Sequence, residues 1–445
     1  MDTNYLEKQK NRITGSVSLK LILIGLLSLL LLIPSGMINN LIAEREMRHR
    51  ETVEEVTSKW GNAQTICGPV LTLPYLTYFK TKEGVRASRN FAHVLPGALT
   101  VNGDLIPEIR YRGIYKVIAY NTKLNLAGFF NPVDFSEWKV EEKDILWDEA
   151  YLTIGITDMR GIKKNILIDW CGKEVNISPG LKSKDIVSSG VTAQTPVKFG
   201  ENCNFSFNID LNGSHYLNFI PLGKETNVKV KSAWATPSFD GMFLPEKHEI
   251  TDTGFVAQWN ILQLNRNYPQ QWTGDEFDVE GSEFGVRLLF PVDTYQKATR
   301  SVKYSLLFIS LTFLVFFFSE VFSKKRIHAV QYLLVGVALV VFYSLLIALS
   351  EHIAFNLAFF IASAATISLV TVFTHSVFSN RITTLSILAV LTALYVFLFT
   401  ILQLSDYSLL LGNVGLFIVL AIVMYFAVKI NWYGGVTVRN GETVD

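Results

Sequence analysis

The stretch LLIALSEHIAFNL (Leu345–Leu357) places a carboxylate next to an imidazole in the middle of a long apolar run. About 19 apolar residues precede Ser350 and about 21 follow His352, and roughly 20 residues are enough for a helix to cross the hydrocarbon of a bilayer. A charged side chain near the centre of a bilayer is costly. The stretch therefore predicts two membrane-spanning helices joined by a hairpin whose tip, Ser350 to His352, lies at a membrane surface.

Composition separates this apolar region from the rest of the chain. Of the 445 residues, 49% are hydrophobic and 18% are charged, and nearly all charged residues come before Tyr304. This pattern indicates a water-soluble domain joined to a membrane part. The net charge is only +1, and no basic stripe with interleaved aromatic residues is present. We therefore expect no nucleic-acid partner.

Six segments are long and apolar enough to span a membrane. They are Leu19–Ile38, Val302–Phe322, Gln331–Leu349, Ile353–Phe373, Ile382–Leu402 and Ser408–Val428. The first follows several basic residues, as a signal peptide would, but its apolar core is long and no small-residue cleavage site follows. We interpret it as an uncleaved anchor.

Loop charges predict the orientation of these spans. The N-terminus, the segment SKKRIH (323–328) and the tail after the last span are basic, so the positive-inside rule places all three in the cytoplasm. The large domain and the two acidic hairpin tips then share the opposite side. We expect a cytoplasmic N-terminus and first span (1–42), a domain on the opposite side of the membrane (43–300), five further spans (301–430) and a cytoplasmic tail (431–445).

The large domain carries the patterns of β-structure. After the first span, the absence of Gly and Pro up to Gly61 predicts that the helix continues past the membrane. Beyond it, segments such as NFSFNIDLNG (204–213) alternate apolar and polar residues, as half-buried strands do. We predict a mainly-β domain built as two packed sheets or as two subdomains.

No known catalytic motif appears in the chain. We find no nucleophile elbow, zinc-protease motif, phosphate-binding loop, dinucleotide fingerprint or C-x-x-C pair. We therefore expect no catalytic residue, cofactor or metal, and we favour a protein that is not an enzyme. The cysteines Cys67, Cys171 and Cys203 are interpreted first as buried small hydrophobic residues and second as containing one disulfide, with the pairing open.

Three residues form the candidate site for a lipid or another ligand: Glu351, His352 and Asp406. On the predicted topology they lie on the outer side of the membrane, where they could converge on a polar headgroup or a cation. The alternative is structural, because Ser350-Glu351 and Ser405-Asp406 stand just before spans, where they can cap a helix N-terminus. A further acid, Glu320, is four residues before Lys324 and is expected to pair with it.

Several long phrases resemble the CreD family of bacterial inner-membrane proteins. They include CGPVLTLPY (67–75), ITDMRGI (156–162), PSFDGMFLPEKHEITDTGFVAQW (237–259) and DYSLLLGN (406–413), and the likeness covers nearly the whole chain. The resemblance implies one N-terminal span, a large periplasmic domain, a C-terminal helical bundle and a role in cell-envelope integrity under stress. It implies no catalytic residues.

Two of these phrases carry local predictions. Asp158 and Arg160, at i and i+2 of an expected strand, lie on one side and can pair. In SFDGMFLPEKHEI (238–250), Asp240-Gly241 predicts a turn, and its apolar neighbours are expected to pack on the core rather than to dip into lipid.

Three functional hypotheses follow. The first is an inner-membrane protein, supporting envelope integrity, whose β-domain binds an envelope component or a periplasmic protein partner while its helices contact membrane lipids. The second is an enzyme or transporter of lipid-linked envelope intermediates with its polar site at Glu351, His352 and Asp406. The third, a signal transducer, lacks a cytoplasmic signalling domain. The sequence leaves the oligomeric state open.

Overall fold

The computed structural model describes residues 17–82, 84–138, 140–198, 200–290, 294–323, 325–404 and 407–429. The chain divides into two compact units. The helical unit comprises Met1–Arg48 together with Val292–Asp445, and the β unit comprises His49–Pro291. Each unit is described by itself.

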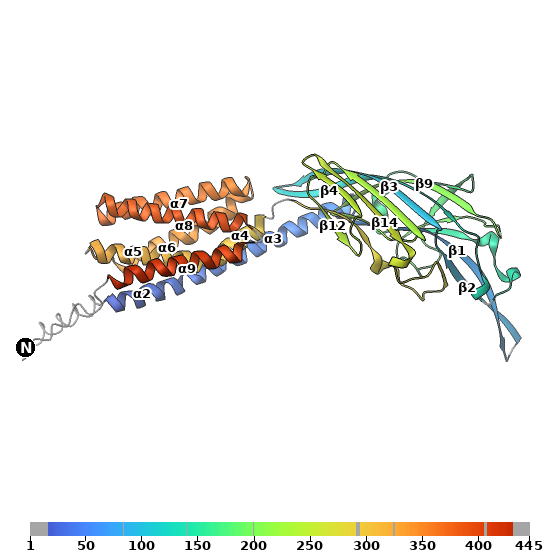
Figure 1. The fold of residues 1–445 in the computed structure, drawn as a ribbon, viewed down its shortest axis with the longest axis horizontal. Coiled ribbons are helices and arrows are strands. Elements are labelled where there is room, and N and C mark those ends of the chain that lie inside the picture. The colour runs from blue at the N-terminus through green and yellow to red at the C-terminus, as the bar shows by residue number, and fades with distance from the viewer. Residues whose placement is uncertain are drawn as a thin grey trace, which may run out of the picture. The chain divides into compact units, whose positions relative to one another are not determined.

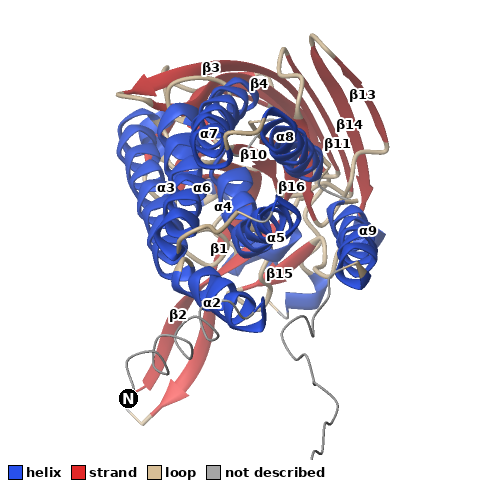
Figure 2. Cartoon of the chain, turned by 90° about the vertical axis from the view of Figure 1, so that its left-hand side faces the viewer, coloured by secondary structure: helices blue, strands red, loops and turns tan. Residues whose placement is uncertain are grey.

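The helical unit consists of the predicted apolar helices and one further helix (Figures 1 and 2). The helices are α2 (Val17–Leu30), α3 (Leu32–Trp60), α4 (Thr294–Lys303), α5 (Ser305–Ser323), α6 (Ala329–Ser350), α7 (Phe355–Phe378), α8 (Arg381–Gln403) and α9 (Ser408–Val428). Within the described residues, six helical segments have the length and apolar composition to span a membrane. They coincide with the six predicted spans, so the predicted membrane-protein fold is confirmed.

The helix α4 was not predicted. Its buried residues Tyr295, Ala298, Ser301 and Val302 recur at helical spacing along one face, while Arg300 and Lys303 occupy its last turn. Because many of its residues are polar, it does not form the long apolar run by which the spans were predicted. It is an amphipathic helix that precedes α5.

The first apolar segment continues without a long interruption from α2 into α3. Hydrogen bonds from the Leu31 and Ser35 amides to carbonyls four residues earlier bridge the junction. The helix α3 then runs to Trp60, immediately before Gly61, whose positive φ of 146° ends it. The prediction that the first helix continues past its apolar run is confirmed.

The β unit has sixteen strands in its described part. They are β1 (Gln64–Thr81), β2 (Gly84–Val94), β3 (Ala98–Arg112), β4 (Tyr115–Phe130), β5 (Tyr151–Ile156), β6 (Leu167–Trp170), β7 (Lys173–Pro179), β8 (Gly190–Gln194), β9 (Cys203–Ser214), β10 (Tyr216–Phe219), β11 (Glu225–Ser232), β12 (Pro237–Gly241), β13 (Lys247–Thr251), β14 (Gly254–Leu262), β15 (Gln271–Thr273) and β16 (Phe284–Leu288).

Hydrogen bonds link the sixteen described strands into one continuous arrangement, in which two sheets meet at β7. The strand β7 pairs with β8 in one sheet and with β6 in the other. The strands β3, β4 and β9 are long antiparallel neighbours (Figure 1). Both sheets contribute to one main hydrophobic core, for example Leu152 from one sheet and Leu126 from the other. The shared core agrees with the prediction of two packed sheets, except that the sheets are continuous with each other through β7. The alternative of two subdomains is wrong, because His49–Pro291 forms one compact unit.

The predicted strand alternation holds in detail. In β9, Phe205, Phe207, Ile209 and Leu211 are all buried, whereas Asn204 and Asn208, at alternate positions of the same strand, are exposed. At the far ends of the two sheets, the ring of Phe239 in β12 meets Trp259 in β14 with centroids 5.8 Å apart. Apolar packing thus joins the sheets where no strand does.

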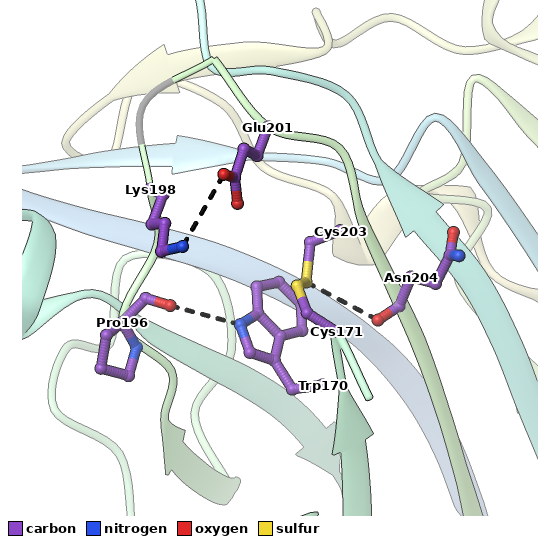
Figure 3. Close-up of a disulfide and its surroundings, with 7 residues drawn as sticks. All are labelled: Trp170, Cys171, Pro196, Lys198, Glu201, Cys203 and Asn204. Atoms are coloured by element: carbon purple, nitrogen blue, oxygen red, sulfur yellow. Dashed lines mark hydrogen bonds and ion pairs between the residues drawn. A yellow bond between two sulfur atoms is a disulfide. The ribbon is translucent and has the colours of Figure 1, made fainter. Parts of the chain in front are cut away.

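A disulfide links Cys171, in the turn after β6, to Cys203 at the start of β9 (Figure 3). Their Cα atoms are 5.1 Å apart, within the range that a disulfide requires. Trp170 lies beside the bridge and donates from its indole nitrogen to the Pro196 carbonyl. The first interpretation of these two cysteines as unbridged was wrong. Cys67 is free, and it is buried, as predicted.

Candidate functional site

The tip of the predicted hairpin is where α6 ends. Glu351 closes α6, with its amide donating to the Ile347 carbonyl, and the Ser350 hydroxyl donates back to the same carbonyl. The next helix, α7, begins after Ala354 and has no side-chain cap. The structural alternative, in which Ser350 and Glu351 cap the following helix, is therefore wrong. Ser405 and Asp406 lie outside the described residues.

The carboxylate of Glu351 faces one cation from the first part of α3. Its Oε2 lies 3.9 Å from Nη1 of Arg45, a weak and long contact. The side chain of Glu351 is only 10% exposed, and Oε1 is buried with no hydrogen-bond partner among the described residues. A buried carboxylate oxygen without a donor is costly, because it has lost water without gaining a replacement. The neighbouring His352 is exposed.

Further polar side chains occupy this end of the helical unit. Lys297 on α4 donates to the Gln403 side chain at 2.9 Å, and Gln403 in turn donates to Asn356 at the start of α7. The ammonium of Lys297 also lies over the ring of Phe355, 5.5 Å from its centroid. Burial, with a smaller contribution from nearby Arg300, lowers the pKa of Lys297. Sequence spacing gave no sign of these contacts, because the two hydrogen bonds join residues 106 and 47 positions apart.

The opposite end of the helical unit is organised around Glu320 in α5. This carboxylate is 4% exposed and receives three donors. Lys20 of α2 forms an ion pair with Oε1, the Ile327 amide donates to Oε1 at 2.9 Å, and the Tyr332 hydroxyl donates to Oε2 at 3.0 Å. The expected partner Lys324 lies outside the described residues. The signal that could have led to Lys20 was its position as a lone cation at the start of the first apolar run.

In the β unit, the buried histidine His93 lies between a hydroxyl and a carboxylate. Its Nδ1 is 3.0 Å from Oγ1 of Thr72, and its Nε2 is 3.1 Å from Oδ2 of Asp185. Burial lowers the pKa of His93, an effect that Asp185 partly opposes. The order hydroxyl, imidazole, carboxylate is that of a catalytic triad. Thr72 and His93 are both buried, however, so the Thr72 hydroxyl does not face solvent.

The two segments for which local predictions were made, 156–162 and 238–250, agree with those predictions only in part. Asp158 does pair with Arg160, with Nη2 and Oδ2 2.8 Å apart, but it does so as the cap of a short 3₁₀ turn rather than within a strand. Burial would raise the pKa of Asp158, yet the donors from Arg160 and the Asn62 amide outweigh it and lower the pKa.

In the second phrase, Phe239 and Phe243 pack against the main core, as expected. Met242 and Leu244 are exposed instead. The prediction that this segment packs on the core therefore holds for its aromatic residues and fails for the other two, because neighbouring side chains along an extended segment point to opposite faces.

Comparison with known proteins now identifies the chain's relatives. The family model described as "Inner membrane protein CreD" matches residues 16–433. The chain belongs to the CreD family. The inner membrane protein CreD of Escherichia coli (strain K12) is 31% identical over 415 residues, which is 91% of each chain. With its apolar helices, this membership makes the protein a multi-pass protein of the inner membrane.

Similarities to solved structures are slight. An M1 zinc metallopeptidase from Deinococcus radiodurans is 8% identical, with a TM-score of 0.18 over 38% of each chain. Native yeast LTA4 hydrolase is also 8% identical, with a TM-score of 0.18 over 49% of this chain and 35% of its own. Values this low carry no argument about this family. Among the described residues, no group of three or more His, Cys, Asp or Glu side chains could hold a metal ion.

Proposed function

We propose that this protein supports the integrity of the cell envelope by holding its β unit in the periplasm, where the unit binds an envelope component or a protein partner. The observation that carries the proposal is the disulfide between Cys171 and Cys203 in a large β unit tethered to membrane-spanning helices. Disulfides form and persist in the periplasm and are rare in the cytosol.

Loop charges support the same orientation independently of the disulfide. Lys325 and Arg326 lie in the turn between α5 and α6, and Lys429 follows α9. Basic loops are retained on the cytoplasmic side. Alternation of the spans then brings Glu351 and the β unit to the periplasmic side.

Thiol labelling tests this orientation. The native cysteines should not react with maleimide, because Cys67 is buried and the other two are bridged. We expect His352→Cys to react with a membrane-impermeant maleimide in spheroplasts, and Arg326→Cys to react only after lysis. Both residues are exposed. The reverse pattern would refute a periplasmic β unit.

A complementation experiment tests the role in the envelope. A strain that lacks the protein should lose tolerance to detergent and to β-lactams, and the wild-type chain should restore it. A version in which the β unit (His49–Pro291) is replaced by an unrelated periplasmic domain should reach the membrane without restoring tolerance. Full tolerance in the deletion strain, or rescue by this chimera, would contradict the proposal.

One observation favours a second candidate function, a lipid-headgroup site at Glu351. The unpartnered Oε1 can accept from an ammonium group, and the guanidinium of Arg45 beside it can donate to a phosphate. Together they match a zwitterionic phospholipid with a primary amine. His352 and Asp406 stay as proposed contributors to this site.

Lipids retained through purification in mild detergent test this second candidate. Quantified by mass spectrometry, the aminophospholipid carried by Glu351→Gln should fall relative to the wild type. Glu44→Gln, which changes an exposed carboxylate on α3, is the matched control and should retain it. Equal retention by the Glu351 and Glu44 variants would exclude the site.

A further inference from the structure

The outward face of one sheet of the β unit carries a groove lined by amide and lysine side chains. The core-facing positions of β3, β4, β9 and β11 are apolar, so the alternate positions point to solvent. These positions line a cavity of about 580 Å³. Its defining residues are Asn102, Lys123, Asn125, Asn208 and Lys229, and we call it the amide groove.

Strand register arranges the groove in two rows. In the first row, Lys229 lies opposite Asn102, Asn102 opposite Asn125, and Asn125 opposite Asn208. Asn125 donates to the Asn208 side chain at 2.9 Å. Neighbouring strands are about 4.8 Å apart, so the row spans roughly 14 Å. It therefore offers a line of amide donors and acceptors across four strands.

The second row is charged and partly neutralised. Asp104 pairs with Lys231 at 3.0 Å, and Asp210 lies 3.5 Å from Lys164. Lys123 lies between these two aspartates in the register but forms no ion pair or hydrogen bond with a described residue. The side chain of Lys229 in the first row is equally unpaired within the described chain.

The net charge and the hydrogen-bonding groups of the groove indicate which class of ligand it can bind. Four lysines and two aspartates line it, an excess of two positive charges. Each amide both donates and accepts, as the hydroxyl groups of a sugar do. An ammonium group without a partner matches a carboxylate. No aromatic residue lines the groove, whereas the apolar centre of a protein–protein interface is enriched in aromatic residues.

We propose that the amide groove binds a glycan strand bearing carboxylate groups. The amide row positions the sugar hydroxyls, and Lys123 and Lys229 hold the carboxylates. The inference rests on the proposed function, since such strands are met by a β unit in the periplasm, and it specifies the class of envelope component that this unit binds.

Binding by the full chain in detergent tests the groove directly. A fluorescent hyaluronan octasaccharide, which carries a carboxylate on every second sugar, should bind, and the affinity should fall as salt rises. Neutral chitohexaose should bind at least tenfold more weakly. Lys123→Ala/Lys229→Ala should weaken hyaluronan binding by roughly a hundredfold, about tenfold for each charged hydrogen bond lost.

Two matched variants separate recognition from charge attraction. Asn102→Ala/Asn125→Ala keeps the charge of the groove and should still weaken binding by roughly tenfold. Lys80→Ala/Lys184→Ala removes two exposed lysines outside the groove and should leave binding unchanged. The assignment is overturned if hyaluronan does not bind, or if the two lysine variants lose affinity equally. It is also overturned if the asparagine variant keeps full affinity, or if poly-glutamate binds as tightly as hyaluronan.

Complementation distinguishes failure of the groove from failure of the proposed function. If the groove variants restore envelope tolerance as well as the wild type does, the glycan assignment fails while the envelope role stands. If the wild-type chain itself restores nothing, the proposed function fails whatever the groove binds.

Discussion

The ion pair between Lys20 and Glu320 gives the sharpest test of how the helical unit is held together. It joins α2 to α5, and the same carboxylate accepts from the Tyr332 hydroxyl of α6. We consider Lys20→Met, which keeps the length of the side chain and removes its charge, together with Glu320→Leu and the double variant. The prediction is that Glu320 and Lys20 are strongly coupled.

The expected magnitude follows from burial. Removing one partner of a fully buried ion pair costs about 3–5 kcal/mol, because the remaining charge is left without compensation. Glu320 is 4% exposed but Lys20 is 26% exposed, so solvent screens part of this cost. We expect Lys20→Met to lower the free energy of unfolding by about 2 kcal/mol. The double variant removes both charges, so the coupling energy should be about 1–2 kcal/mol.

The free energy of unfolding of the four chains can be measured by titrating SDS into mild-detergent micelles and following helical circular dichroism. The exposed pair Glu44 and Arg48 on α3 supplies the control cycle, for which we expect about 0.3–0.5 kcal/mol. If the effects of Lys20→Met and Glu320→Leu simply add, or if the control pair couples as strongly, the reasoning from burial is wrong.

Three further predictions concern the β unit. Replacing Cys171 and Cys203 by Ser should lower the unfolding free energy of the β unit by about 3–4 kcal/mol, because the bridge closes a loop with a sequence separation of 32 residues. Urea titrations followed by tryptophan fluorescence measure this loss, and a loss below about 1 kcal/mol would contradict the prediction. Because burial lowers the pKa of His93, the unfolded state takes up a proton first as pH falls. Stability should therefore decline below about pH 6.5 by up to about 1.4 kcal/mol per pH unit, and His93→Gln should abolish that part of the slope. Gly61→Ala should cost at least about 1 kcal/mol at its positive φ, whereas Gly281→Ala, with open space around it, should cost less when thermal unfolding is compared.

The membrane part could be predicted from sequence because one physical length governs it. The thickness of the hydrocarbon fixes how many apolar residues a span needs, so each span is visible as a run in the chain. The same rule located the turn at Glu351, since no single helix could contain both flanking runs. Strands of the β unit were visible for a similar local reason, the two-residue alternation seen in β9.

The partners of the polar groups could not be predicted in the same way. Glu351 meets Arg45 and Glu320 meets Lys20, each across about three hundred residues. Sequence spacing proposes only neighbours within a turn or two of helix, which is why Lys324 was the expected partner of Glu320. Long-range contacts of this kind depend on which helices pack together, and no periodicity in one chain carries that information.

The buried carboxylates at the two ends of the helical unit differ in how completely they are hydrogen-bonded, and this difference bears on the proposed headgroup site. Glu320 has a donor for each oxygen and a cation beside it, so nothing is left for a ligand to satisfy. Glu351 is almost as buried, yet one oxygen has no donor and its cation is at the limit of an ion pair. A fold that satisfies one buried carboxylate fully could satisfy the other by the same means. A buried polar group without a partner calls for an explanation, and a bound ligand that supplies the missing partner is one such explanation. Full pairing at Glu320 is what a structural contact requires, whereas incomplete pairing at Glu351 is the observation that supports the proposed headgroup site.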